Sequence, residues 1–110
     1  MMKFAFVSDA AHREYQKLPA LIQDEFGKDL RRIQFGEAPN LPIEHLSESV
    51  GIGSFELKIN GSPAYRCVYV TKYAGTVIVL HSFVKTTNGV DKKAMKVAKQ
   101  RLKVLLSQLN

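Results

Sequence analysis

Three strand signals follow one another in residues 54–85, which read SFELKINGSPAYRCVYVTKYAGTVIVLHSFVK. The first segment, residues 54–59, alternates polar and apolar side chains, which predicts a half-buried strand. Residues 65–71 are rich in tyrosine and valine, and residues 76–84 are apolar on both faces, which is typical of a central strand. Short turns separate the three segments and predict an antiparallel meander; they lie at residues 60–63 and 72–75.

The N-terminal third of the chain predicts a short strand and two helices. Residues 3–7 alternate weakly and form the strand, after which Ser8 or Asp9 can cap a helix that stops near Pro19. The second helix begins at this proline and ends at Gly36. Its apolar stripe has spacings of four, four and three residues and consists of Ile22, Phe26, Leu30 and Ile33. Two helices joined at one proline predict an antiparallel helical hairpin.

The remaining segments complete the predicted order. Residues 37–53 contain two prolines and two glycines, so we expect a long loop. Asp91 is a good N-cap for a last helix over residues 92–109. The order β-α-α-β-β-β-α predicts an α+β fold with an antiparallel sheet, and we expect the helices to cover one face of it. A chain of this length buries one core, so residues 1–110 are expected to form a single domain.

The formal net charge of +6 lies entirely in residues 81–110, because acidic and basic side chains balance in residues 1–80. The last helix carries lysines at spacings of four, three and four residues, with one further lysine beside the row. These are Lys92, Lys96, Lys99 and Lys103, and the neighbouring Lys93. A one-sided positive field favours a polyanionic partner, which is nucleic acid, an acidic protein segment or an anionic membrane surface. The alternative is a solvated helix face whose lysines serve solubility.

Cysteine content and hydropathy indicate the compartment. Cys67 is the one cysteine, so no internal disulfide forms and a reducing compartment is expected. The longest strictly aliphatic run, residues 77–80, is far shorter than the roughly 20 residues that span a bilayer. Asp9 follows the first residues too soon for a signal peptide. We therefore expect a basic cytoplasmic protein that spans no membrane.

Three motifs follow one another along the predicted meander: Phe55-Glu56-Leu57-Lys58, Tyr65-Arg66-Cys67-Val68-Tyr69 and Leu80-His81-Ser82-Phe83-Val84-Lys85-Thr86-Thr87. In this order they resemble the RelE/ParE toxin superfamily, and within it the HigB-like, phage-derived branch. In that branch a segment like ELR precedes a YRVLY-like strand, and a strand ending in LHGF-K-KT leads into a lysine-rich helix, which residues 92–101 resemble. The likeness covers nearly the whole chain and implies a small RelE-like fold.

The resemblance implies the toxin of a bacterial type II toxin–antitoxin system. RelE- and HigB-like toxins enter the ribosomal A site and cut mRNA there without a metal or other cofactor, by activating the RNA 2′-hydroxyl against the neighbouring phosphate. The implied partners are the ribosome, mRNA and a cognate antitoxin with a helix-turn-helix domain, and the free toxin is expected to be a monomer. Two alternatives stay open: a ParE-like inhibitor of DNA gyrase, and a non-catalytic phage-derived domain that binds RNA or protein.

Metal-free RNA cleavage needs a base, an acid and a cation that stabilises the charge on phosphorus. Arg66 is the first candidate, since a guanidinium suits bidentate phosphate contact; its structural alternative is an ion pair with Glu56. Lys58 stands where the family has a basic residue, on a strand face that we expect to be open. Lys85 closes the last strand, where the resemblance implies a phosphate-holding cation; the alternative is a solvent-exposed lysine.

His81 is the fourth candidate catalytic residue, either as a proton carrier or as a packed side chain, because both faces of its strand are apolar. The helix lysines are expected to bind RNA. Two positions depart from RelE-like toxins: Glu56 and Thr86 stand where those toxins often have basic residues. A carboxylate at residue 56 either repels phosphate or acts as a base. Three histidines and one cysteine without ligand spacing predict no metal site.

Overall fold

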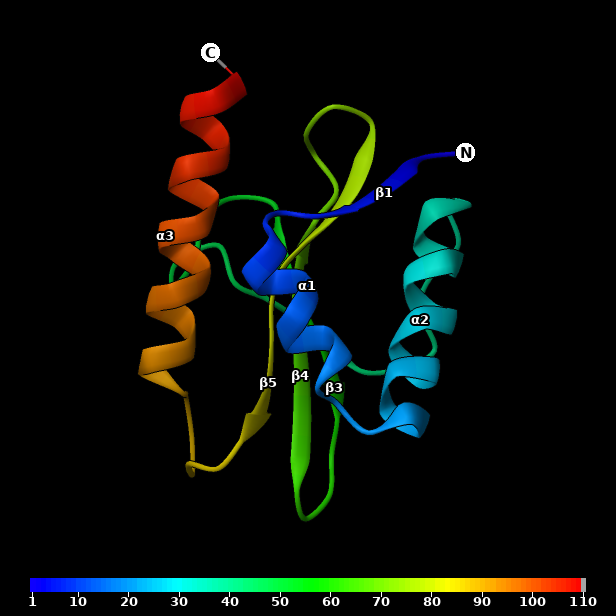
Figure 1. The fold of residues 1–110 in the computed structure, drawn as a ribbon, viewed down its shortest axis with the longest axis vertical. Coiled ribbons are helices and arrows are strands. Elements are labelled where there is room, and N and C mark those ends of the chain that lie inside the picture. The colour runs from blue at the N-terminus through cyan, green and yellow to red at the C-terminus, as the bar shows by residue number, and fades with distance from the viewer. Residues whose placement is uncertain (110) are drawn as a thin grey trace.

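A mixed five-stranded sheet flanked by three helices makes up the computed structural model, which describes residues 1–109 (Figure 1). Asn110, the last residue of the predicted domain, lies outside the described residues. In chain order the elements are β1 (Lys3–Phe6), α1 (Asp9–Gln16), α2 (Ala20–Gln34), β2 (Ile43–His45), β3 (Ser54–Ile59), β4 (Ala64–Val70), β5 (Thr76–Lys85) and α3 (Lys92–Leu109). The α+β class, the helical hairpin, the three-strand meander and the C-terminal helix are thereby confirmed.

Two strands differ from the expectation. The three residues of β2 lie within the segment predicted to be a loop, because so short and exposed a strand carries no periodic signal. β2 pairs antiparallel with β3, with Ile43 opposite Leu57. β1 pairs parallel with β5, with Lys3 opposite Thr76, so the sheet is mixed and not purely antiparallel. The strand order is β1-β5-β4-β3-β2, so β5 is an inner strand between β1 and β4, as its two apolar faces predicted.

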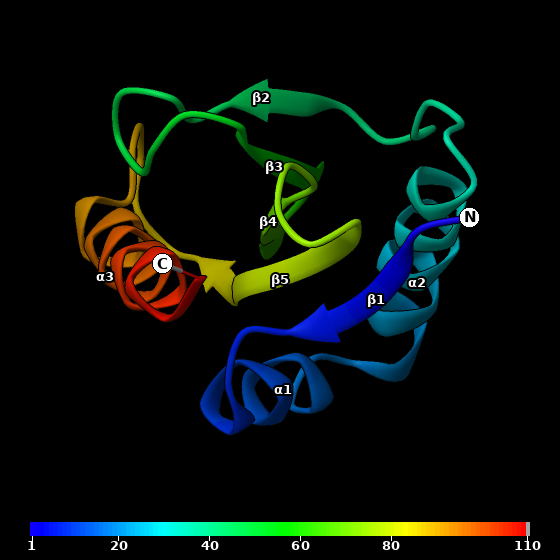
Figure 2. The same cartoon turned by 90° about the horizontal axis from the view of Figure 1, so that it is seen from above.

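The helices cover both faces of the sheet, which corrects the expectation that they share one. Figure 2 shows α3 and α2 on opposite sides of β3, β4 and β5. The physical reason is that β4 and β5 carry apolar, buried side chains on both faces of the sheet, so each face needs a cover. We call the side covered by α3 the α3 face, and the side covered by α1 and α2 the hairpin face.

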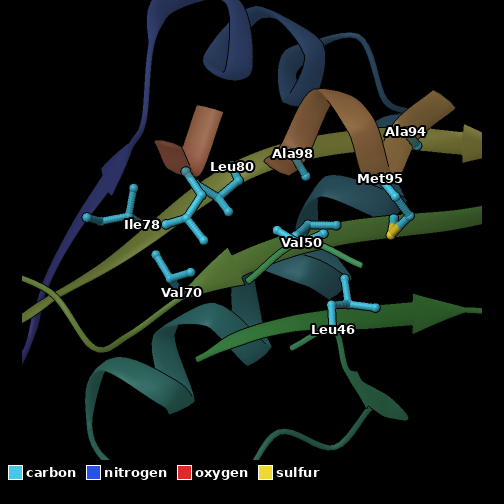
Figure 3. Packing of buried hydrophobic residues seen from close by; sticks show 10 residues of the cluster. Leu46, Val50, Val70, Ile78, Leu80, Ala94, Met95 and Ala98 are labelled. Atoms are coloured by element: carbon cyan, nitrogen blue, oxygen red, sulfur yellow. The ribbon is translucent and has the colours of Figure 1, made fainter. Parts of the chain in front are cut away.

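The core of the α3 face joins the sheet to α3 and to the loop after β2 (Figure 3). Its buried residues are Leu46, Val50, Val68, Val70, Ile78, Leu80, Ala94, Met95, Ala98 and Leu102. Full burial of one such large side chain contributes about 1.5–3 kcal/mol. α3 begins at the predicted cap, since the Asp91 carboxylate accepts a hydrogen bond of 3.0 Å from the backbone N–H of Ala94.

The hairpin-face core lies beneath α2. Phe26 and Leu30 of α2 pack there against Leu57, Cys67 and other residues of β3, β4 and β5. Ser8 is the side chain that caps α1, where its hydroxyl accepts a hydrogen bond of 3.2 Å from the N–H of Ala11. Because Phe26 and Leu30 pack in this core, the predicted apolar stripe of α2 is confirmed as the buried side of that helix.

A buried carboxylate anchors the segment that leads into β2. Asp29 of α2 is only 2% exposed and accepts hydrogen bonds from the backbone N–H groups of Asn40 at 3.0 Å and Leu41 at 2.8 Å. β2 therefore starts from a fixed point, although its own three residues are exposed. Within the described part of the chain, no helix is long and apolar enough to cross a bilayer.

Candidate active site

An open cavity of about 700 Å³ lies on the α3 face. Its walls come from β2 and the loop that follows it, from β3, β4 and β5, and from the start of α3. Seven charged side chains line it: Glu44, Glu48, Glu56, Lys58, Arg66, Lys85 and Asp91. Three of the four predicted catalytic residues therefore share one cavity, namely Lys58, Arg66 and Lys85.

The strand register brings these side chains together. Lys58 of β3 lies directly opposite Arg66 of β4, and Glu44 of β2 lies directly opposite Glu56 of β3. Residues two apart on a strand point to the same face, so Glu56 and Lys58 share the α3 face with both partners. Lys85 pairs with Ala64, two residues before Arg66 on β4. The charged group therefore spans four adjacent strands.

Arg66 is buried in the floor of the cavity, with 6% of its surface exposed. Its Nη1 donates hydrogen bonds to the carbonyl oxygens of Tyr65 at 3.0 Å and Ile59 at 3.4 Å. Its Nε lies 3.7 Å from the nearer carboxylate oxygen of Glu56 and is the one buried side-chain nitrogen or oxygen of residues 1–109 without a hydrogen-bond partner. Arg66 thus forms the ion pair given as its structural alternative, and it also faces the cavity.

Glu56 is a buried carboxylate that keeps contact with the cavity. Burial raises the pKa of Glu56, against the opposing effect of the nearby charges of Arg66 and Lys58. Its strand face was expected to be open, but Ser54 and Glu56 are 1% and 7% exposed. That expectation was wrong because the loop after β2 packs on the start of β3, where Ser54 donates a hydrogen bond to the Leu46 carbonyl, and only the end at Lys58 stays accessible.

The two lysines of the cavity have different partners. Lys58 forms an ion pair and hydrogen bond with Glu44, across the edge of the sheet. Lys85 donates a hydrogen bond of 2.6 Å to the backbone carbonyl of Thr87, just beyond its own strand. Both side chains are half-buried, so their ammonium groups lie at the wall of the cavity and not in its floor.

His81, the fourth predicted catalytic residue, lies outside the cavity. Its Nδ1 is 2.8 Å from a carboxylate oxygen of Glu14, and Arg101 donates to the two oxygens of that carboxylate at 2.7 and 2.9 Å. Burial would raise the pKa of Glu14, but the hydrogen bonds from Arg101 and His81 outweigh it and lower this pKa. The His81 ring stacks on Phe83, a residue of the cavity wall, at 5.0 Å between centroids.

The lysines of the last helix remain on the surface. Lys92, Lys93, Lys96, Lys99 and Lys103 are all exposed, and none forms an ion pair with a residue of the described chain. The residues just before α3 line the cavity, so the lysine row begins beside it. The other histidines are packed against aromatic rings, His12 on Phe6 and His45 on Phe55.

Glu44 and Glu48 also line the cavity, although no motif of the sequence indicated them as site residues. Both lie in the segment read as a loop, where alternation over three residues is too short to indicate a strand. The one local signal was the order Ile43-Glu44-His45. In a strand, Glu44 points to the face opposite that of Ile43 and His45. Cys67 is buried, and burial raises the pKa of its thiol to about 12.

A known protein family matches most of the chain. The family described as phage derived protein Gp49-like (DUF891) matches residues 13–103 of the chain. This range contains every charged residue of the cavity and the Glu14, His81 and Arg101 cluster. No curated protein matches the chain.

Proposed function

Because the chain belongs to the Gp49-like family of phage-derived proteins, we propose that it is the toxin of a type II toxin–antitoxin system and cuts mRNA on the ribosome. The likeness of its strand motifs to the HigB-like branch of the RelE/ParE superfamily supports this assignment. One observation carries the proposed chemistry: Lys58, Arg66 and Lys85 line the same cavity as the Glu56 carboxylate, which lies 3.7 Å from Arg66, and the cavity is large enough for a nucleotide.

Each of these groups has a role in the proposed cleavage. Glu56 takes the proton of the RNA 2′-hydroxyl, whose oxygen attacks the adjacent phosphorus. Arg66 and Lys58 stabilise the negative charge that grows on the phosphoryl oxygens. The bond from phosphorus to the 5′-oxygen breaks, and Lys85 donates a proton to that oxygen. The products are a 2′,3′-cyclic phosphate and a free 5′-hydroxyl.

The environment of Glu56 suits the role of base. Burial raises the pKa of its carboxyl toward the working pH, which strengthens it as a proton acceptor. Arg66 holds the carboxylate from 3.7 Å, while the backbone carbonyls of Tyr65 and Ile59 hold the guanidinium. His81 is already bonded to Glu14, so the proton carriers proposed here are Glu56 and Lys85.

The proposed partners follow from the charge on α3. Its exposed lysines are suited to the phosphates of ribosomal RNA, and they lead from the cavity along one element. A cognate antitoxin with a helix-turn-helix domain would neutralise the toxin by laying an acidic or amphipathic segment over this surface. The site of action is then the cytoplasm, where ribosomes are.

The test is induction of the protein in a bacterial host, with mapping of mRNA 5′ ends on ribosomes. The wild type should arrest growth and produce new ends inside translated codons. Arg66→Ala should lower cleavage by about 10²-fold, the usual loss for one preorganised charge-stabilising donor. Arg66→Lys should restore only part of the activity, because an ammonium makes no bidentate contact.

Arg32→Ala is the matched control, since Arg32 lies on α2 in a surface ion pair with Glu37. It should stay fully active. Circular dichroism must show that Arg66→Ala is folded before its activity is compared. Growth arrest without new mRNA ends, together with inhibition of DNA gyrase supercoiling by the purified protein, would replace the nuclease by a gyrase inhibitor.

A further inference from the structure

The four charged residues at the floor and edge of the cavity form an unusual pattern across β2, β3 and β4. Residues directly opposite one another carry the same charge: Glu44 faces Glu56, and Lys58 faces Arg66. Like charges directly opposite on neighbouring strands are destabilising. The opposite charges meet on the diagonals instead, as the ion pairs Lys58–Glu44 and Arg66–Glu56. Each cation therefore has one carboxylate as its counter-ion.

The two counter-ions differ in how firmly the fold holds them. The Glu56 side chain is 9% exposed and lies on β3, between β2 and β4. The Glu44 side chain is 49% exposed and lies on a three-residue strand at the edge of the sheet. An exposed ion pair contributes little free energy, so Glu44 is easily separated from Lys58. Glu56 has no comparable freedom.

We propose that Glu44 is a displaceable counter-ion, which holds Lys58 in the empty cavity and leaves it when a phosphate of RNA enters. The proposal rests on the assignment of this cavity as an RNA site. Lys58 and Arg66 lie directly opposite each other on β3 and β4. Once Glu44 is displaced, the incoming phosphate is the anion that both cations contact. Glu44 thereby makes the cavity selective, because a ligand must offer Lys58 a better anion than the carboxylate it replaces.

The experiment compares Glu44→Gln with Glu48→Gln. Glu48 is exposed, lines the same cavity and carries the same charge, but it forms no ion pair with a residue of the described chain. The probe is a short 2′-O-methyl RNA oligonucleotide, which binds without being cut. Glu44→Gln should bind it about two- to five-fold more tightly than the wild type, which is the scale of one exposed ion pair. Glu48→Gln should bind it within the error of the wild type.

A second measurement observes Lys58 itself. In protein with ¹³C-labelled lysine, the side-chain resonance of Lys58 should shift when inorganic pyrophosphate is added, and it should respond at lower pyrophosphate concentration in Glu44→Gln. Equal affinities of Glu44→Gln and wild type for the oligonucleotide, an equal gain in Glu48→Gln, or a Lys58 resonance insensitive to pyrophosphate in Glu44→Gln would each overturn the proposal. If Glu44→Gln binds the oligonucleotide more tightly but the wild type cuts no mRNA, the counter-ion role of Glu44 stands and the proposed nuclease function is wrong.

Discussion

At the scale of single residues, the Glu56–Arg66 pair is costly for the fold. Both side chains are under 10% exposed, so both charges have lost most of their hydration. The separation of 3.7 Å and the unpartnered Nε return only part of that loss. A well-packed apolar pair of similar volume is often at least as stable as a buried ion pair. A buried ion pair with such a cost, in the floor of a cavity, is typical of a functional site.

Cleavage should depend on pH through Glu56. The proposed base must be ionised, so the rate should fall as the pH decreases through the raised pKa of Glu56. Glu56→Gln should be about 10²-fold or more slower and should lose this acid limb. Cleavage of a ribosome-bound mRNA across pH 5–8 measures both effects. An acid limb that survives in Glu56→Gln belongs to another group.

The same carboxyl affects stability with a defined sign. The folded pKa of Glu56 lies above its ordinary value of 4.5, so protonation favours the folded chain. Its favourable contribution is complete below pH 4.5 and is lost as the pH rises through the folded pKa. Urea unfolding of the wild type and of Glu56→Gln at several pH values separates this contribution from the other carboxyl groups. Glu48→Gln, which changes an exposed carboxylate of the same cavity, is the control.

At the scale of elements, α3 combines a packed side with a charged side. Ala94, Met95, Ala98 and Leu102 are buried against the sheet, whereas the lysines point to solvent. The helix therefore holds its charges in a fixed row beside the cavity. The buried residues of α3 stabilise the helix on the sheet. The lysine row forms no ion pair within the described chain and does not contribute to this packing.

The lysine row should contribute affinity and not chemistry. The triple change of Lys92, Lys96 and Lys99 to Gln should weaken ribosome binding. It should also reduce the slope of log affinity against log salt by about two to three, because fewer counter-ions are released. Binding is measured by co-sedimentation at several salt concentrations. A triple change of Lys3, Lys17 and Lys28 to Gln removes equal charge from other exposed positions and should leave the slope unchanged.

At the scale of the whole molecule, one cluster ties the two helical layers together. Glu14 of α1, His81 of β5 and Arg101 of α3 meet at the side of the sheet where β1 has ended. Arg101 Nη1 also donates a hydrogen bond of 3.0 Å to the carbonyl of Leu80. The cluster therefore connects α1 to α3 through an inner strand and fixes the position of the helix whose start forms one wall of the cavity.

The stability that the protein loses when this cluster is broken should depend on pH. Glu14→Gln should lower the free energy of unfolding at pH 7 by about 1–2 kcal/mol, as expected for hydrogen bonds to a charged group. The folded pKa of Glu14 lies below its ordinary value of 4.5, so this stabilisation is present above pH 4.5 and is lost as the pH falls through the folded pKa. Urea unfolding at pH 7 and pH 3 measures the difference. An equal loss at both pH values would contradict the ionic contribution.

The sequence alone determined the elements whose signals are local. The apolar segment of residues 76–84 and the stripe of α2 each reflect which sides of the element are buried, and the structure confirms them. The alternation of residues 54–59 predicted a strand, which the structure confirms, but the polar side of that strand is buried as well. The likeness of the strand motifs similarly pointed to Lys58, Arg66 and Lys85, which share one cavity because strand register follows from short turns.

Tertiary structure decided everything that depends on contacts between distant residues. The parallel pairing of β1 with β5 and the short strand β2 have no periodic signal of their own. The partner of His81 lies 67 residues away along the chain, at Glu14, so its exclusion from the cavity could not be read from its own strand. Glu44 likewise lies in the site because of a contact between distant segments, the pairing of β2 with β3 that places it opposite Glu56. Periodicity reports which side of an element is buried, whereas the partner of a side chain is set by how the elements pack.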